Sequence, residues 1–428
     1  MSNFDDILCG IVLPLSLIII GIFFSIKFKL FYIFHPIRTL KDMLGGQSDG
    51  IRSLCVALAG TLGVGNIVGV ASAIVTGGAG SVFWMWISAF CAMSLKYAEV
   101  YLAMRFRQSK NGEYYGGAHY YIYYGMNKKL GKMAAYFLSC TFALFCVINS
   151  LTTGNLVQVN SVSALLPLSS ILFGLAFSLL SFIIIIGGIA RIRKITSFLI
   201  PLLSFIFIFA CAYILLVNLS RLGDIFSLIV KEAFSKKAAV SGFCGYGISE
   251  AIRYGVNRGI LSNEAGCGTS PIAHASSKTQ SYHSQSCLGI LEVFVDTILL
   301  CTLCAFVILL YGFNDGANPM ETVLNSFEFY LGDFGKYLII VLSISFALAT
   351  VICQFYYGIE SLKYISRKKM SSLIFILTFS ATTVIGAIIP MSIMWKISDL
   401  TITFMTLFNL TILILLRKEI PSGSNLKN

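Results

Sequence analysis

Four glycines and an asparagine interrupt an uncharged, apolar segment of this chain. Residues 54–75 contain no charged side chain, yet residues 60–71 within them read GTLGVGNIVGVA. In the hydrocarbon core of a membrane every backbone N–H and C=O group needs a hydrogen-bond partner, so a helix is interrupted only where protein or a ligand cavity satisfies the freed groups. Glycines also let helices pack closely, but these are denser than packing requires. We therefore predict a small-molecule or ion site at this interruption.

A second stretch has the same character. Residues 239–268, AVSGFCGYGISEAIRYGVNRGILSNEAGCG, are rich in glycine and contain Glu250, Arg253, Arg258 and Glu264. Two interrupted segments in corresponding halves of a chain are typical of secondary transporters built from inverted repeats. An ion channel also uses glycine-rich segments, but its filter is usually repeated by oligomer symmetry. Two different interrupted helices in one chain therefore favour a transporter.

The composition indicates the environment that must hold these segments. Of the 428 residues, 57% are hydrophobic and 12% are charged, and the mean hydropathy is +0.84, whereas soluble domains are about a quarter charged. The chain is therefore a polytopic membrane protein in contact with a lipid bilayer. Its net charge of +12 is spread over short loops between apolar runs. That distribution favours an anionic membrane surface over nucleic acid as the partner.

Apolar runs of spanning length predict eleven membrane helices. The first is interpreted as a retained helix, because the start MSNFDD is acidic where a signal peptide would be basic. The expected spans are residues 7–27, 53–75, 81–104, 134–164, 170–188, 196–218, 239–262, 287–312, 335–361, 371–392 and 396–416. Five spans begin with each interrupted segment. We therefore expect one peripheral helix in residues 1–30, a first five-helix repeat at 51–220, an oppositely oriented second repeat at 238–417, and a tail at 418–428.

The distribution of Lys and Arg predicts the orientation. If the N-terminus lies outside, most basic loop residues fall inside, as the positive-inside rule requires. We therefore expect a multi-pass protein of the cell (plasma) membrane with its N-terminus outside and a cytoplasmic C-terminal tail.

Other chemistries find little support in the sequence. No serine-hydrolase, zinc-protease or phosphate-loop motif is present, so we expect no enzyme and no cofactor besides a coupling ion. Most of the twelve cysteines lie in apolar runs without metal-ligand spacing, which indicates small core residues. His119 and His274 have no carboxylate or cysteine at ligand spacing, so no further metal is expected. Without an ATPase domain, an ion gradient must drive transport.

The chain resembles the alanine/glycine:cation (sodium) symporter family over nearly its whole length. The most specific stretch is IRYGVNRGILSNEAGCGTSPIAHA at residues 252–275, and other matching stretches lie at 60–107, 154–162, 187–196, 291–309 and 345–360. The resemblance implies an all-α polytopic fold, a leucine-transporter-type five-plus-five inverted repeat with one extra N-terminal helix. It also implies import of small neutral amino acids by symport with sodium, with proton coupling as the alternative.

The resemblance implies a substrate site at the first interruption. The N–H groups of Val64 and Gly65 would face the substrate carboxylate, with Gly63 and Asn66 in the same turn, because a half-helix N-terminus attracts anions. Gln158, in the sequence GNLVQVN, would lie at the substrate. A glutamine in such a helix can also simply hydrogen-bond a neighbouring helix.

The resemblance also implies a sodium site, for which carbonyl and hydroxyl oxygens are suitable ligands. The carbonyls of Ala59 and Leu62 would face the ion, together with the carbonyl of Ala347 and the hydroxyl of Thr350, which are spaced i, i+3. A threonine in a membrane helix often bonds its own backbone instead. The family commonly has a second hydroxyl just before this threonine, where this chain has Ala349, so the number of oxygen ligands stays open.

Two implied pocket positions depart from the family. Leu261 stands where the family typically has phenylalanine, just before the SNEAG motif that contains Asn263, and Gln354 stands where it typically has tryptophan. The loss of two rings should enlarge the pocket and make it more polar. A buried Gln354 needs a hydrogen-bond partner, which a polar substrate could supply. Glutamine, asparagine and serine are therefore candidate substrates beside alanine and glycine.

Several ionisable residues fall within the expected spans. An unpaired charge costs several kcal/mol at the centre of a bilayer, so these residues should form ion pairs or gates near the water interface. Their individual roles are left open; they are Glu99, Arg253, Arg258, Glu264, Asp296 and Asp399.

Overall fold

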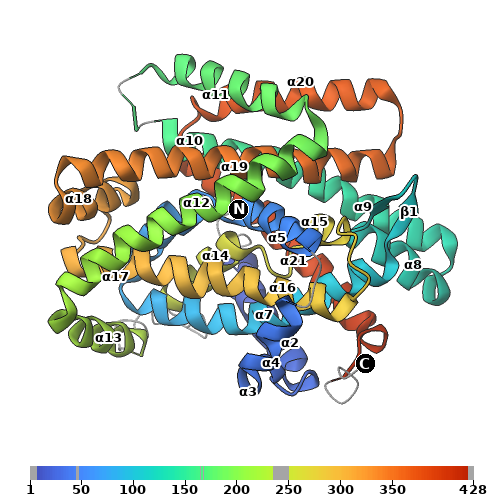
Figure 1. The fold of residues 1–428 in the computed structure, drawn as a ribbon, viewed down its shortest axis with the longest axis horizontal. Helices are drawn as coiled ribbons and strands as arrows, with labels where there is room; N and C mark the ends of the chain where they lie inside the picture. Colours follow the sequence, from blue (N-terminus) through green and yellow to red (C-terminus); the bar gives the residue numbers. More distant parts are fainter. Residues whose placement is uncertain (1–6, 45–47, 164, 167, 235–249, 423–428) are drawn as a thin grey trace.

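The computed structural model describes residues 7–44, 48–163, 165–166, 168–234 and 250–422. Helices make up most of this chain (Figure 1). Helices suit apolar runs because a helix satisfies its backbone groups internally. In the first half they are η1 (Leu8–Val12), α2 (Leu13–Lys27), α3 (Phe31–Phe34), α4 (Pro36–Leu44), α5 (Ser48–Thr61), η2 (Val64–Asn66), α6 (Val68–Gly77), α7 (Gly80–Phe106), α8 (Ala118–Leu130), α9 (Lys132–Leu151), η3 (Thr152–Leu156), α10 (Val157–Ser163), α11 (Ser170–Ile185), α12 (Gly188–Val217) and α13 (Leu219–Ala233).

The second half is also helical, and one small hairpin interrupts the first half. Strands β1 (Gln108–Lys110) and β2 (Glu113–Tyr115) pair antiparallel between α7 and α8. The helices of the second half are α14 (Glu250–Asn263), α15 (Pro271–Ala275), α16 (Tyr282–Val293), η5 (Phe294–Cys301), α17 (Thr302–Tyr311), α18 (Pro319–Leu331), α19 (Asp333–Ile365), α20 (Lys369–Gly386), α21 (Met391–Leu415) and η6 (Arg417–Glu419).

Length and hydropathy single out fewer spans than the sequence predicts. Within the described residues seven helices could cross a membrane, or eight if the bent pair Ser48–Thr61 and Val64–Gly77 is one span. The expected span at 81–104 is the continuous helix α7, which carries Lys96, Glu99 and Arg105. The expected span at 170–188 is α11, which has only 16 residues. The count of eleven therefore stays a prediction.

Both interruptions are present in the described chain, but they differ in form. The first is a sharp one, with an angle of 66° between its two halves. The second lies at residues 264–270, between the end of α14 and the start of α15. The expected beginning of that segment, residues 239–249, lies outside the described residues.

The helices stack in layers around the first interruption. Figure 1 shows α11 and α20 as an outer layer above α19, with α7 and α16 on the opposite side. Within this arrangement α5 packs against α12 and α19, and α6 packs against α14 and α18. The two halves of the interrupted helix therefore lie between long helices from distant parts of the chain.

Polar side chains of the fourth expected span, Asn155 and Asn160, join neighbouring helices. Asn155 Nδ2 donates to the Phe379 carbonyl at 2.8 Å, and Asn160 Nδ2 donates to the Gly386 carbonyl at 2.9 Å. The cysteines that the structure describes are free thiols, and all but Cys140 are buried. Their interpretation as core residues is therefore confirmed for this part of the chain.

Candidate functional site

The first interruption depends on a glycine that has no room for a side chain. Helix α5 ends at Thr61, Gly63 is extended, and a single 3₁₀ turn precedes α6. A Cβ atom added to Gly63 would lie 2.5 Å from Gln158 Oε1 and 2.7 Å from Thr350 Oγ1. Both distances are shorter than any ordinary contact, so glycine is needed here for close approach rather than for an unusual φ angle.

Polar groups from three helices meet at this glycine. The Val64 N–H donates to Gln158 Oε1 at 3.0 Å, and the Thr350 hydroxyl donates to the Leu62 carbonyl at 3.3 Å. Gln158 belongs to α10 and Thr350 to α19, and both side chains are buried. The structure thus brings together five of the predicted residues from three distant parts of the sequence: Leu62, Gly63, Val64, Gln158 and Thr350.

Gln158 occupies the N–H group that the sequence assigned to a carboxylate. The amide oxygen of Gln158 accepts from Val64 at an ordinary hydrogen-bond distance. A carboxylate could take this N–H only if the Gln158 side chain moved. Because the Val64 N–H of this turn already donates to an oxygen, the turn offers the kind of backbone donor that anion binding requires.

The two remaining predicted cation ligands lie within one helical turn of Leu62 and Thr350 along the chain. Ala59 is fully buried in the last turn of α5, and Ala347 is fully buried one turn before Thr350 on α19. A narrow gap, too small for a water molecule, is lined by residues from the interruption and by three apolar side chains from other helices: Leu62, Gly63, Asn66, Ile67, Phe207, Leu300 and Phe346.

Asn66 belongs to a second polar group, centred on Asp296. The Asn66 amide donates to Asp296 Oδ1 at 2.8 Å and to the Ser262 hydroxyl at 3.0 Å. Ser262 in turn donates to Asp296 Oδ2 at 2.6 Å. Asp296 is fully buried and lies in the π-helical segment η5, a local geometry that is frequent at functional sites. Neither Ser262 nor a definite role for Asp296 could be recognised from the sequence, because their partners come from distant helices.

Asn263 and Leu261 lie beside this group rather than at Gly63. Asn263 Nδ2 donates to the Thr297 hydroxyl at 3.0 Å, and Thr297 donates to Asp296 Oδ2 at 2.7 Å. The Leu261 carbonyl would be 3.7 Å from a Cβ added to Gly65. The first interruption therefore contacts the last turn of α14, just before the second interruption, through Gly65 and Asn66.

Gln354 has a partner within the chain, which changes its expected role. Its Nε2 donates to Glu264 Oε1 at 2.7 Å and more weakly to the Gly60 carbonyl at 3.4 Å. Among the described residues its Oε1 is buried without a hydrogen-bond partner. Glu264 thus supplies a partner for the donor of Gln354, and only the acceptor is left open to the polar substrate that the sequence suggests. Glu264 also accepts a hydrogen bond from the Thr269 hydroxyl.

Lys96 anchors a fully buried charge network next to the second interruption. Its Nζ lies 3.2 Å from Glu292 Oε1 and donates to the Ser270 hydroxyl at 2.7 Å. His274 Nε2 lies 2.9 Å from Glu292 Oε2. This carboxylate partner of His274 lies 18 residues further along the chain, so spacing in the sequence did not predict it. Glu292 was missed, although a carboxylate in an apolar run always needs a partner.

Glu99 and Arg258 each have their own partners. Glu99 accepts hydrogen bonds from the Gly268 N–H at 2.8 Å and from Asn409 at 2.6 Å, so it holds the second interruption through its backbone. Arg258 forms an ion pair with Asp399 at 3.1 Å and lies over the Trp395 ring. The expectation of ion pairing is thus confirmed for Arg258 and Asp399. Within the described residues no cluster of three or more His, Cys, Asp or Glu could hold a metal ion.

Comparisons with known proteins agree with this architecture. A model of the sodium:alanine symporter family matches residues 1–424. The sodium/alanine symporter AgcS of Methanococcus maripaludis is 34% identical over 395 residues, which cover 90% of this chain and 85% of that protein. The probable sodium/glutamine symporter GlnT of Bacillus subtilis is 29% identical over 437 residues, covering 97% and 87%.

A solved structure shows the same fold at low sequence identity. The crystal structure of MhsT in complex with L-phenylalanine aligns with a TM-score of 0.57 and 12% identity, covering 85% of this chain and 88% of that one. The all-α, leucine-transporter-type fold is therefore shown for this chain.

Proposed function

Because the chain belongs to the sodium:alanine symporter family, we propose that it imports small neutral amino acids together with sodium. Amino acid symport follows from the family. The choice of substrate, the coupling ion and the site residues are our proposal. The observation that carries it is the meeting of Val64, Gln158 and Thr350 around Gly63, where an interrupted helix presents both donors and acceptors.

The turn at residues 63–66 is the proposed carboxylate site. It precedes the ten-residue helix α6, whose N-terminal dipole end favours an anion. Gln158 releases the Val64 N–H as the substrate carboxylate enters. The side-chain amide of Gln158 then has both a donor and an acceptor to offer to the same substrate.

Sodium is proposed to bind at the carbonyls of Ala59, Leu62 and Ala347 and the hydroxyl of Thr350. The Leu62 and Thr350 oxygens are 3.3 Å apart. Two oxygens at this separation can both lie about 2.3–2.6 Å from one ion, the range that hard cations such as calcium use. The ion would displace the hydrogen bond between them, because the hydroxyl must turn its lone pair toward the cation.

Polar amino acids are proposed as substrates beside alanine and glycine. Gln354 lies one turn beyond Thr350 on α19, and its buried Oε1 can accept a hydrogen bond from a substrate amide or hydroxyl. Leu261, Asn263 and Asn66 would complete the wall of the pocket. One relative is named a probable sodium/glutamine symporter, which is consistent with this range.

Proton coupling is the second candidate, and one observation favours it. Asp296 is fully buried and bonds directly to Asn66 of the interrupted helix. A carboxylate so placed could take up a proton in one conformation and release it in another.

Uptake into proteoliposomes tests the proposal. Labelled alanine, glycine, serine, asparagine and glutamine are offered with an inward sodium gradient or with choline in its place. We expect accumulation only with the sodium gradient, and counterflow that saturates. Uptake that persists in choline and collapses with a protonophore would establish the proton-coupled alternative. If alanine and glycine displace all polar substrates, the proposed substrate range is wrong.

A further inference from the structure

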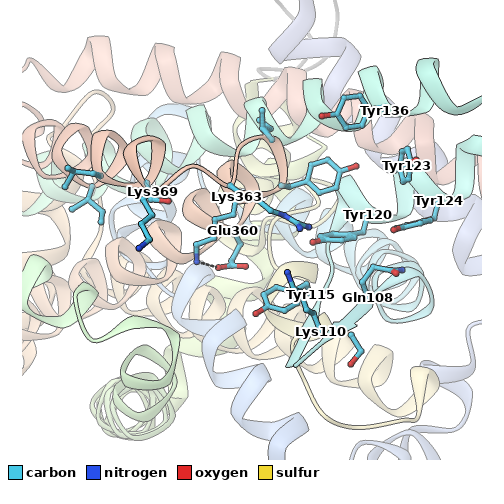
Figure 2. Close-up of a pocket in the computed structure, with 17 residues that line it drawn as sticks. Gln108, Lys110, Tyr115, Tyr120, Tyr123, Tyr124, Tyr136, Glu360, Lys363 and Lys369 are labelled. Carbon is cyan, nitrogen blue, oxygen red and sulfur yellow. Dashed lines mark hydrogen bonds and ion pairs between the residues drawn. The ribbon is translucent and has the colours of Figure 1, made fainter. Parts of the chain in front are cut away.

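A large pocket lies away from the interruptions, where α19 ends and α20 begins. Its volume is about 1040 Å³, and its walls come from α8, α9, α19, α20 and the β1–β2 hairpin. Figure 2 shows basic and acidic groups from α19 and α20 on one side of this pocket, facing a group of tyrosines: Tyr120, Tyr123, Tyr124 and Tyr136.

The charged lining of the pocket is mostly basic. It contains four basic side chains and one carboxylate, namely Lys110, Lys363, Arg367, Lys369 and Glu360. Lys363 pairs with Glu360 at 2.8 Å. Among the described residues no carboxylate lies within ion-pair distance of Lys110, Arg367 or Lys369. Three basic side chains of the pocket thus have no ion-pair partner among the described residues, and the one carboxylate of the lining is already paired with Lys363, which suits a ligand that carries a phosphate.

The tyrosines add neutral hydrogen-bond donors to the same pocket. Burial raises the pKa of Tyr120 to about 12, so its hydroxyl keeps its proton at neutral pH and can donate to an anion. Tyr124 and Tyr136 are exposed toward the surroundings, with 39% and 51% of their area accessible. Tyrosines of this kind gather at the boundary between hydrocarbon and headgroups.

The pocket continues into a lipid-facing surface. Leu373 and Ile376 of α20 line it. Helix α20 is the least buried of the candidate spans, with 22% of its apolar window covered by protein. Leu373 is 50% exposed and Leu377, one turn further, is 61% exposed. A ligand in the pocket can therefore extend apolar chains along α20, which a water-soluble phosphate cannot do.

We propose that this pocket binds an anionic phospholipid, with its phosphate among Lys110, Arg367 and Lys369 and its acyl chains along α20. The basic headgroup pocket and the exposed apolar helix below it match the two parts of such a lipid. The site is separate from the transport site and stands whether or not the proposed substrate is correct. A bound lipid would join the hairpin and α8 to the α19–α20 corner.

Native mass spectrometry of the full chain in detergent tests this site. The probes are dioleoylphosphatidylglycerol and dioleoylphosphatidylcholine, which share their acyl chains and differ in net charge. We expect the anionic lipid to bind more tightly. Each basic residue near a membrane surface is worth about a fivefold change in affinity, so the double variant R367Q/K369Q should bind phosphatidylglycerol about 30-fold more weakly. The control K128Q/K132Q removes two exposed lysines outside the pocket and should bind normally.

A further arm distinguishes a lipid from a soluble phosphate. Leu373→Gln is expected to weaken phosphatidylglycerol binding and leave the fold intact, because this side chain is half exposed. sn-Glycerol 3-phosphate and inorganic phosphate at millimolar concentration should not displace the lipid. Equal binding of the two lipids, equal losses in R367Q/K369Q and K128Q/K132Q, or displacement by soluble phosphate would each overturn the proposal. Size-exclusion profiles and thermal unfolding identify any variant that has lost its fold. If R367Q/K369Q is such a variant, the binding of phosphatidylglycerol to Leu373→Gln decides whether the site exists.

Discussion

At Gly63 the absence of a single side chain lets oxygen atoms from three helices meet. The Leu62 carbonyl, the Gln158 amide and the Thr350 hydroxyl all lie around it. The Leu62 and Thr350 oxygens are neutral, so under the proposal they coordinate a monovalent cation without a fixed charge, while the Gln158 oxygen accepts from the Val64 N–H. At this scale the proposed coupling chemistry depends on individual oxygen atoms, of which the Thr350 hydroxyl can be removed by a single substitution.

Replacing Thr350 with valine tests the cation site, because valine keeps the shape and removes the hydroxyl. A hydrogen bond or ligand contact to a charged group is worth about 1.5–3 kcal/mol, so the apparent affinity for sodium should fall by roughly 10- to 100-fold. The measurement is uptake as a function of sodium concentration. Thr350→Ser, which keeps the hydroxyl, is the control. An unchanged sodium dependence in the valine variant would exclude Thr350 as a ligand.

Gln354→Trp tests the substrate range. The change removes the open Oε1 acceptor and the hydrogen bond to Glu264, and it places a bulkier indole ring at this buried position. The preference for glutamine over alanine should fall by at least about tenfold, since a site that hydrogen-bonds its ligand discriminates more strongly than an apolar one. Competition assays on both forms measure this ratio. A ratio that does not change would show that Gln354 does not contact the substrate.

The Lys96–Glu292 pair predicts a large stability effect. Lys96→Met leaves a fully buried Glu292 without its cation, and such losses are about 3–5 kcal/mol. The double change Lys96→Met with Glu292→Gln should recover much of this stability, because no buried charge then lacks a partner. Thermal unfolding in detergent gives the comparison. If the double variant is no more stable than the single one, the ion pair is not the reason for the loss.

At the scale of the elements, the two interrupted helices are fixed by contacts with each other. Asn66 of the first reaches Ser262 of α14 and Asp296 of η5, while Glu99 of α7 holds the backbone of the second. A shift of one interruption must therefore change the hydrogen bonds of the other. This arrangement suits a transporter in which both repeats move around a shared site.

Gly63→Ala tests the first interruption, and the chain offers a matched control. The new methyl group would lie 2.5 Å from Gln158 Oε1 and 2.7 Å from Thr350 Oγ1, so these side chains or the turn must shift, and overpacking of this kind costs about 1–3 kcal/mol. Gly69→Ala is the control, because nothing lies within 4 Å of a Cβ at that position. We expect uptake to be lost in the first variant and kept in the second. Equal uptake by the two variants would mean that the close approach at Gly63 is not required.

What the sequence could predict at this scale follows from which signals are local. Glycine density predicted the interruption at 62–66, and the i, i+3 spacing placed Ala347 near Thr350, because both depend on a few adjacent residues. The Lys96–Glu292–His274 network could not be found in this way. It depends on which helices lie side by side, and spacing along the chain carries no such information. Gln354 shows the same limit, since its partner Glu264 comes from the other interruption.

At the scale of the whole molecule, the distribution of charge predicts how the protein sits in its membrane. The basic loop between α19 and α20 and the hairpin between α7 and α8 lie on the same side, because both line the pocket of Figure 2. The proposed lipid site therefore requires these two loops to face the same leaflet. The positive-inside rule assigns that side to the cytoplasm.

Accessibility of tags in intact cells tests this orientation. We expect a tag before Met1 to be reached by an impermeant antibody from outside, and a tag after Asn428 to be reached only after permeabilisation. A cysteine placed at Lys110 or Lys369 should behave like the C-terminal tag, because an odd number of spans separates these loops from an outside N-terminus. The thiol background is low for this purpose, since nearly all described cysteines are buried. If the tag after Asn428 and the cysteines at both loop positions were labelled from outside, the protein would have the opposite orientation to the predicted one. Labelling of only one loop would instead contradict their common position at the pocket, and with it the binding of one lipid by both.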